Sequence, residues 1–125
     1  MIDIEELKRH FETDEFRYPG SFVKAVELNL FYFDIWRIFE NDEAFRKMEG
    51  VKERYPHRKL IPFAKRDDCD DIACFEIGKG DKVQIIHDYA SKGYEQRMEY
   101  DDFWEWLRDA VDVMIEYNRD EERYG

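Results

Sequence analysis

The chain is short of the residues that many enzyme classes depend on. It has two cysteines, Cys69 and Cys74, and two serines, Ser21 and Ser91, among 125 residues. Two cysteines are too few for the disulfide framework of a small secreted domain, and their separation does not match a CxxC redox motif. Neither serine lies in a GxSxG sequence, the context of the nucleophile in many hydrolases. The sequence therefore gives no support to a thiol or serine enzyme.

Histidines and long apolar runs are also scarce. His10, His57 and His87 do not stand at metal-ligand spacing from one another or from a cysteine. No run approaches the roughly 18 apolar residues of a membrane span, and the first ten residues lack the apolar segment of a signal peptide. We therefore expect a cytoplasmic protein that binds no metal and no other cofactor and makes no contact with a membrane.

Basic residues are fewer than acidic ones. The chain has 20 Lys and Arg residues against 31 Asp and Glu residues, a formal net charge of −11. Affinity for nucleic acid depends on clustered basic side chains that release counterions from phosphates, so direct binding to DNA or RNA is not expected. An acidic surface favours a basic protein partner because it raises encounter rates. The alternative is that this charge serves solubility alone.

Aromatic residues, by contrast, are abundant at 17% of the chain. A disordered acidic chain carries few aromatics, so this content predicts a folded interior beneath a charged exterior. The length is close to the commonest domain size. We assign residues 1–125 to one domain, with a frayed acidic tail from about residue 119.

Strand-like segments fill the middle of the chain. Three of them, residues 60–64 (LIPFA), 72–78 (IACFEIG) and 82–89 (KVQIIHDY), are separated by an aspartate-rich turn and a glycine turn. Residues 94–100 (YEQRMEY) follow as a fourth, and together they predict an antiparallel sheet. Residues 31–38 fit both strand alternation and a buried helix, and we interpret them as extended.

Helical periodicity lies on either side of these strands. Residues 2–11 predict a short amphipathic helix capped by Asp3, residues 21–30 a second capped by Ser21, and residues 42–55 a third capped by Asn41. Gly50 weakens the third helix, and Pro56 ends it.

The clearest helix runs from Phe103 to about Asn118, and its cap is Asp101 or Asp102. Helices, then a run of strands, then a closing helix are the pattern of an α+β fold. We expect a central, mainly antiparallel sheet of about four to six strands, packed by N-terminal helices and a long C-terminal helix.

No constellation of catalytic or metal-binding residues emerges. Asp67, Asp68, Asp70 and Asp71 could attract a hard cation, but a calcium loop needs alternating oxygen ligands and usually a glycine. We interpret these residues as a solvated turn. His87 and Asp88 are the nearest approach to an acid–base pair, yet neighbours in a strand point to opposite faces. The sequence thus predicts no catalytic residue.

Acidic residues are concentrated at the end of the chain. Residues 99–125 contain ten acidic side chains against three basic ones, more than solubility requires. Trp104 lies outside the apolar stripe of the closing helix, either at the edge of the core or as an exposed anchor for a partner. Our candidate partner-binding residues are Asp67, Asp68, Asp70, Asp71, Asp101, Asp102, Trp104, Glu105, Asp109 and Asp112.

Several segments in order resemble a known family. They are residues 60–64 (LIPFA), 71–75 (DIACF), 83–87 (VQIIH), and the helix opening that contains Phe103, Trp106 and Leu107. This succession is similar to the SUKH superfamily, in particular to the bacterial branch related to a fungal cell-wall-synthesis regulator. It covers residues 60–107. The resemblance implies an α+β fold without catalytic residues and, in bacteria, an immunity protein that neutralises a toxin domain, often a nuclease.

We accordingly expect a cytoplasmic immunity protein, monomeric or weakly dimeric, that is not an enzyme and whose acidic surface binds a basic toxin. The alternative is a regulatory or adaptor domain that binds a cellular protein. An enzyme would require a deep polar pocket around His87 and the aspartate turn, residues 67–71.

Overall fold

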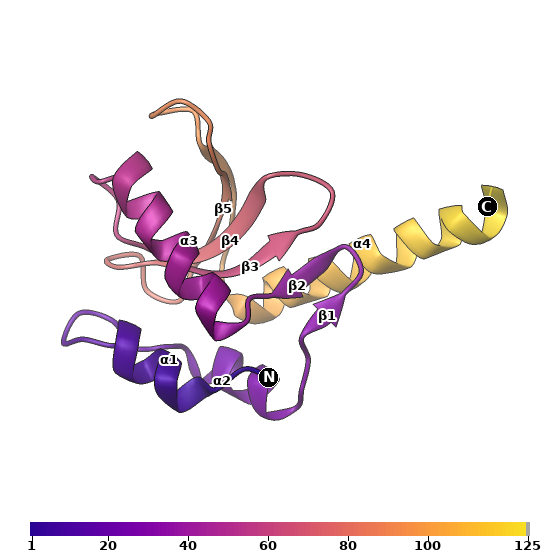
Figure 1. Ribbon diagram of the computed structural model, residues 1–125. Coiled ribbons are helices and arrows are strands. Elements are labelled where there is room, and N and C mark those ends of the chain that lie inside the picture. The colour runs from indigo at the N-terminus through magenta and orange to yellow at the C-terminus, as the bar shows by residue number, and fades with distance from the viewer. Residues whose placement is uncertain (125) are drawn as a thin grey trace.

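The computed structural model describes residues 1–124, which form four helices and six strands (Figure 1). The helices are α1 (Ile4–Phe11), α2 (Gly20–Glu27), α3 (Asn41–Arg54) and α4 (Phe103–Tyr124). The strands are β1 (Tyr32–Phe33), β2 (Trp36–Ile38), β3 (Leu60–Arg66), β4 (Asp71–Glu76), β5 (Val83–His87) and β6 (Gln96–Tyr100). The expected α+β class is confirmed, as are the antiparallel sheet and the long C-terminal helix.

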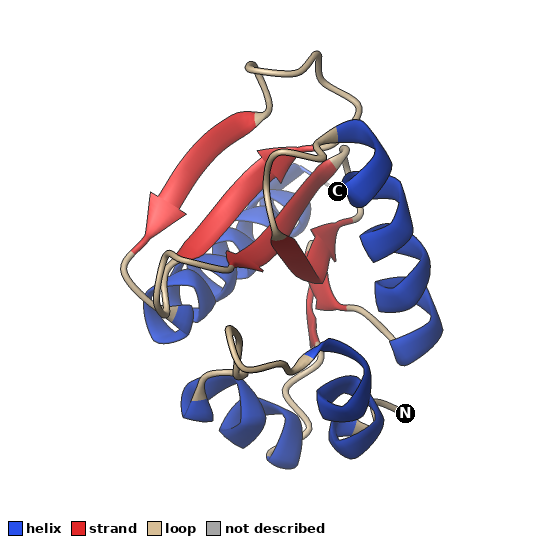
Figure 2. Ribbon diagram, turned by 90° about the vertical axis from the view of Figure 1, so that its left-hand side faces the viewer, coloured by secondary structure: helices blue, strands red, loops and turns tan. Residues whose placement is uncertain are grey.

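The six strands form one antiparallel meander, in which every strand pairs with its neighbours in sequence. Helix α3 lies on one face of this sheet and α4 on the other, while α1 and α2 lie together at one end (Figure 2). Both faces are therefore covered. This explains why β4 is almost entirely buried and reads as a continuous apolar run rather than an alternating one.

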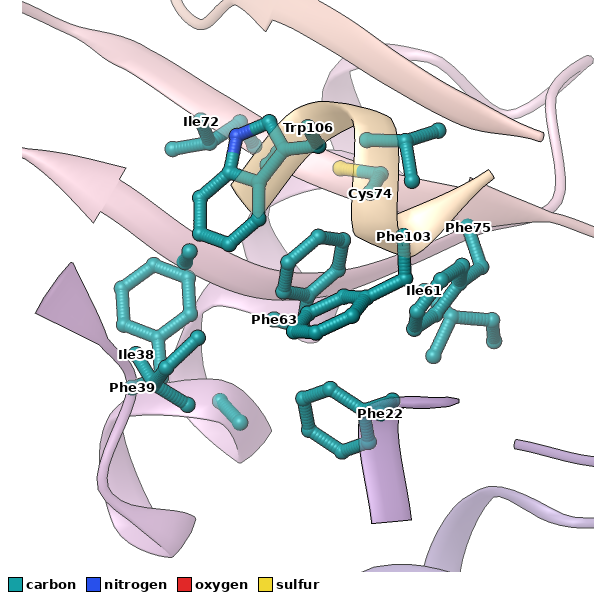
Figure 3. Close-up of a cluster of buried hydrophobic side chains, with 14 of the residues drawn as sticks. Phe22, Ile38, Phe39, Ile61, Phe63, Ile72, Cys74, Phe75, Phe103 and Trp106 are labelled. Atoms are coloured by element: carbon teal, nitrogen blue, oxygen red, sulfur yellow. The ribbon is translucent and has the colours of Figure 1, made fainter. Parts of the chain in front are cut away.

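An aromatic cluster forms the core between the sheet and the helices α2 and α4 (Figure 3). Phe63 of β3 stacks on Phe75 of β4, with ring centroids 4.5 Å apart, and meets Trp106 edge to face at 5.0 Å. Phe22 and Phe103 close the cluster from the two helices. Such pairs contribute about 0.5–1.5 kcal/mol each beyond the burial of their area.

The ambiguous segment, residues 31–38, is a β-hairpin of β1 and β2, so the extended interpretation is confirmed. The caps of two helices differ from prediction. Helix α2 begins at Gly20 directly after Pro19, and Ser21 lies inside it. Helix α3 begins after Glu40, whose backbone N–H donates to the Glu43 carboxylate at 3.1 Å.

Asn41 is buried and joins two helices instead of capping one. Its amide nitrogen donates to the Asp3 carbonyl oxygen (2.9 Å) and to the Glu6 carboxylate (2.6 Å), and its amide oxygen accepts from the Asp3 N–H (3.1 Å). A tertiary contact thus outweighs the local preference of asparagine for a cap.

Helix α4 begins as predicted, because the Asp102 carboxylate accepts from the Glu105 N–H at 2.9 Å. It continues beyond the predicted end at Asn118 as far as Tyr124, so the segment interpreted as a frayed tail is helical in the structure. Every residue from Ile115 to Tyr124 is exposed. The last turns of α4 therefore extend past the body of the protein, as Figure 1 shows.

Candidate functional site

The aspartate turn between β3 and β4 is largely paired with other side chains of the same chain. Asp67 pairs with Arg37 (3.0 Å) and Asp68 with Arg66 (2.8 Å), while Asp71 lies 2.8 Å from His87 and 3.9 Å from Arg97. The hydrogen bond from Arg66 lowers the pKa of Asp68. Within residues 1–124, only Asp70 of this group has no ion-pair partner. The turn thus offers less free negative charge than its sequence suggests.

His87 faces Asp71 across the sheet rather than its sequence neighbour Asp88. His87 and Asp71 are register partners on β5 and β4, and Nδ1 of the histidine lies 2.8 Å from Oδ1 of the carboxylate. Asp88 turns to the opposite face, toward α3. The expectation that His87 and Asp88 point apart is confirmed.

Four carboxylates follow one another along the exposed side of α4, and we call them the acidic stripe: Glu105, Asp109, Asp112 and Glu116. Their spacings of four, three and four place them on one helix face, about a third of a turn from the buried face that contains Trp106 and Ala110. Like charges at these spacings destabilise a helix by about 0.2–0.5 kcal/mol per pair.

The acidic stripe has few partners within the described residues. Glu116 lies 3.7 Å from Arg119, and Asp109 accepts a 2.5 Å hydrogen bond from the Tyr100 hydroxyl. Burial, and after it this carboxylate, raise the pKa of Tyr100, which keeps the hydroxyl protonated as a donor. Glu105 and Asp112 have no ion-pair partner in residues 1–124.

Trp104 and Asp101 extend the acidic stripe at the start of α4. Trp104 is 44% exposed and touches Phe103 edge to face, with centroids 5.7 Å apart. Its position fits an exposed anchor at the edge of the core. Asp101 is also exposed. Asp102 is half-buried, and its carboxylate already accepts a hydrogen bond as the helix cap.

The predicted partner-binding residues therefore fall into two groups. Tyr100, which directly precedes the α4 group, pairs with Val83 at one end of β5, whereas Asp71 of the turn pairs with His87 at the other end. The structure gathers the α4 residues on one helix and separates them from the aspartate turn.

The chain also forms a cleft rich in positive charge, which the sequence did not reveal. We call it the basic cleft, a cavity of about 320 Å³ between α3, β3 and the loop after β5. Its lining residues are Phe39, Glu43, Arg46, Lys47, Gly50, Arg54, Lys65 and Tyr89. Four of these eight side chains are cations in a chain whose net charge is −11.

A buried carboxylate holds two of these cations in place. The Asp88 side chain is fully buried and accepts from Lys47 Nζ (2.8 Å), Arg54 Nε (2.7 Å) and Arg54 Nη2 (2.7 Å). Burial raises the pKa of Asp88, but these hydrogen bonds outweigh it and leave the pKa below its ordinary value. Asp88 is therefore ionised at neutral pH and orients both side chains.

Gly50 and Tyr89 complete the basic cleft. A Cβ at Gly50 would lie 2.6 Å from Arg54 Nη2, so only glycine leaves the guanidinium in its observed place. Tyr89 has a φ of 69°, a left-handed conformation that is uncommon for a tyrosine, and its ring centroid lies 4.1 Å from the Arg54 guanidinium carbon. Strained backbone of this kind is found preferentially at functional sites.

The sequence held one signal for the basic cleft. Arg46, Gly50 and Arg54 recur every four residues, so a helix must place them on one face. Glycine is unfavourable inside a helix, so Gly50 between two arginines marks a position where the absence of a side chain needs a reason. The sequence alone could not place Lys65 and Asp88 beside these residues, because their position depends on the register of the strands.

Within residues 1–124, no helix combines the length and the apolar composition that crossing a bilayer demands. In the same range, no three side chains from His, Cys, Asp and Glu are grouped so as to hold a metal ion. Comparisons of the chain with protein-family models, with curated proteins and with solved structures found no match.

Proposed function

We propose that this protein is a non-catalytic binding domain whose α4 surface, the acidic stripe with Trp104 at its edge, binds a basic protein. The observation that carries the proposal is the alignment of four carboxylates, three of them exposed, on one helix face, where Arg119 approaches Glu116 and Arg108 lies within one turn of Glu105 and Asp112 without pairing with either. Such an arrangement costs helix stability in the free protein, and a basic partner would remove that cost.

The partner class follows from the resemblance to the SUKH superfamily. The segments that carry this resemblance form β3, β4, β5 and the opening of α4, which all contribute to the folded core. On this basis the protein is an immunity protein of the cytoplasm, a monomer or weak dimer, and its partner is a toxin domain, in particular a nuclease. The carboxylates would occupy the basic surface on which such a toxin binds phosphate, and Trp104 would supply the apolar contact.

The second candidate is a regulatory or adaptor domain that binds a cellular protein through the same surface. The related fungal regulators motivate this reading. The gene directly upstream separates the two, because an immunity gene follows the gene of its toxin.

The test is binding between the purified chain and the protein encoded directly upstream, measured calorimetrically at about 50 and 200 mM salt. We expect affinity to fall as salt screens the charges. The variants Glu105→Gln and Asp112→Gln should each weaken binding, and Trp104→Ala should weaken it further.

Glu53→Gln is the matched control, since this exposed glutamate lies in α3, on the opposite face of the sheet from α4. Binding that is indifferent to salt, or that responds to Glu53→Gln as strongly as to Glu105→Gln, would argue against the acidic stripe as the interface.

A further inference from the structure

We propose that the basic cleft binds the phosphate monoester of a small molecule. The cleft lies on the α3 side of the sheet, so this site is separate from the acidic stripe on α4 and does not depend on it.

The charge of the cleft matches a dianion. Its cations are Arg46, Lys47, Arg54 and Lys65, and the carboxylates that line it or contact these cations are Glu43 and Asp88. Four positive and two negative groups leave a net charge of +2. A phosphate monoester carries nearly two negative charges at neutral pH.

Two of these cations are fixed and two are free. Asp88 holds Lys47 and Arg54 in the wall of the cleft. Arg46 and Lys65 make no ion pair within residues 1–124 and approach the cavity from α3 and β3. A fixed guanidinium supplies directed donors without losing side-chain entropy on binding, and the free cations can close on the anion.

Gly50 supports the same assignment. Glycine within a helix costs about 1 kcal/mol relative to alanine. Here its missing side chain makes room for the Arg54 guanidinium, which lines the cavity and reaches Asp88.

The size of the cleft and the position of Tyr89 indicate the rest of the ligand. A volume of about 320 Å³ is at the small end of the range of cavities that bind small molecules. The Tyr89 ring is 62% exposed and borders the cations, so it offers a surface for a flat or apolar group beside the phosphate. The left-handed backbone at Tyr89 places this ring at the mouth of the cleft.

The test is a titration of the whole chain, followed by ¹H–¹⁵N NMR at constant ionic strength, with inorganic phosphate, phenyl phosphate and phenol as probes. We expect inorganic phosphate and phenyl phosphate to shift the resonances of residues around the cleft, and phenyl phosphate to bind more tightly than inorganic phosphate. Phenol, which lacks the phosphate, should shift no resonances. Arg46→Gln and Lys65→Gln should each weaken binding of phenyl phosphate about tenfold, the effect of one charged hydrogen bond.

Lys52→Gln is the matched control, because Lys52 is an exposed cation on the far side of the same helix. Equal weakening by Lys52→Gln and Arg46→Gln would overturn the site, as would shifts centred away from α3 or no response of the wild-type chain. A phosphoserine peptide that binds more tightly than phenyl phosphate would overturn the assignment to a small molecule. Thermal melting confirms that each variant is folded.

Discussion

Arg54 and Asp88 are joined by two parallel hydrogen bonds, each 2.7 Å long, from Nε and Nη2 of the guanidinium to the two carboxylate oxygens. Because the Asp88 side chain is fully buried, this pair and Lys47 form a charged group beneath the wall of the basic cleft. A buried charge is tolerated only while its partner remains, so much of the local stability depends on Asp88.

Replacing Asp88 by asparagine should destabilise the protein by about 3 kcal/mol, because two partly buried cations lose their counter-charge. Urea unfolding followed by tryptophan fluorescence measures this change. Asp70→Asn is the control, since Asp70 is exposed, and it should change stability by less than about 0.5 kcal/mol. Equal midpoints for the two variants would contradict a structural role for the Asp88 charge.

The same carboxylate predicts how stability depends on pH. Burial raises the pKa of Asp88, but the hydrogen bonds from Arg54 and Lys47 lower it by more. Its pKa in the folded protein therefore lies below that in the unfolded chain. The stabilisation by Asp88 is therefore complete above the unfolded pKa of about 3.9 and is lost as pH falls through the folded value.

The measurement is the difference in unfolding free energy between wild type and Asp88→Asn from pH 6 to pH 2. We expect a constant difference above about pH 5 that shrinks below pH 4. A difference that stays unchanged at pH 2.5 would show that the Asp88 charge is not responsible.

Gly50→Ala should fail to give the usual gain of about 1 kcal/mol for removing a glycine from a helix. The new Cβ would lie 2.6 Å from Arg54 Nη2 and would displace a guanidinium that Asp88 holds. Urea denaturation should show unchanged or lower stability, with weaker binding of phenyl phosphate.

Gly20→Ala provides the comparison, because Gly20 also lies in a helix but has nothing within 4 Å of the added Cβ. If Gly50→Ala instead raises stability by about 1 kcal/mol, Arg54 can move without cost and the account of Gly50 is wrong.

Asp112→Lys should stabilise the free protein by about 0.5 kcal/mol, since it converts repulsion from Asp109 and Glu116 into attraction, which outweighs the new repulsion from Arg108. The gain should disappear at about 1 M salt, where exposed charges are screened. Thermal melting at low and high salt measures both effects. Asp81→Lys changes the net charge equally but lies outside the stripe, so an equal gain from it would point to net charge as the cause.

The sequence was sufficient for most of the fold. Regular apolar spacing and turn residues located the strands around Phe63, Phe75 and Ile85 and the helix around Trp106, because these residues repeat with the period of their element. The exact helix starts were less predictable. Asn41 has the chemistry of a cap, yet a tertiary hydrogen bond to Asp3 uses it elsewhere.

The charges were harder to interpret than the strands. The aspartates around Asp68 suggest a free acidic loop in sequence, but the register of β2, β3 and β5 brings Arg37, Arg66 and His87 to them. The basic cleft depends on the same long-range pairing. A local pattern fixes the face of an element on which a charge lies, and only the tertiary fold determines which charges meet.

The order of the meander has a consequence for biosynthesis. Each strand pairs with the one before it, so each strand can add to the sheet as soon as it leaves the ribosome. Helix α4, which covers the aromatic face around Phe63, is made only afterwards. Until Phe103 and Trp106 emerge, α2 alone can cover that face, and this interval is when the nascent chain is most exposed to aggregation.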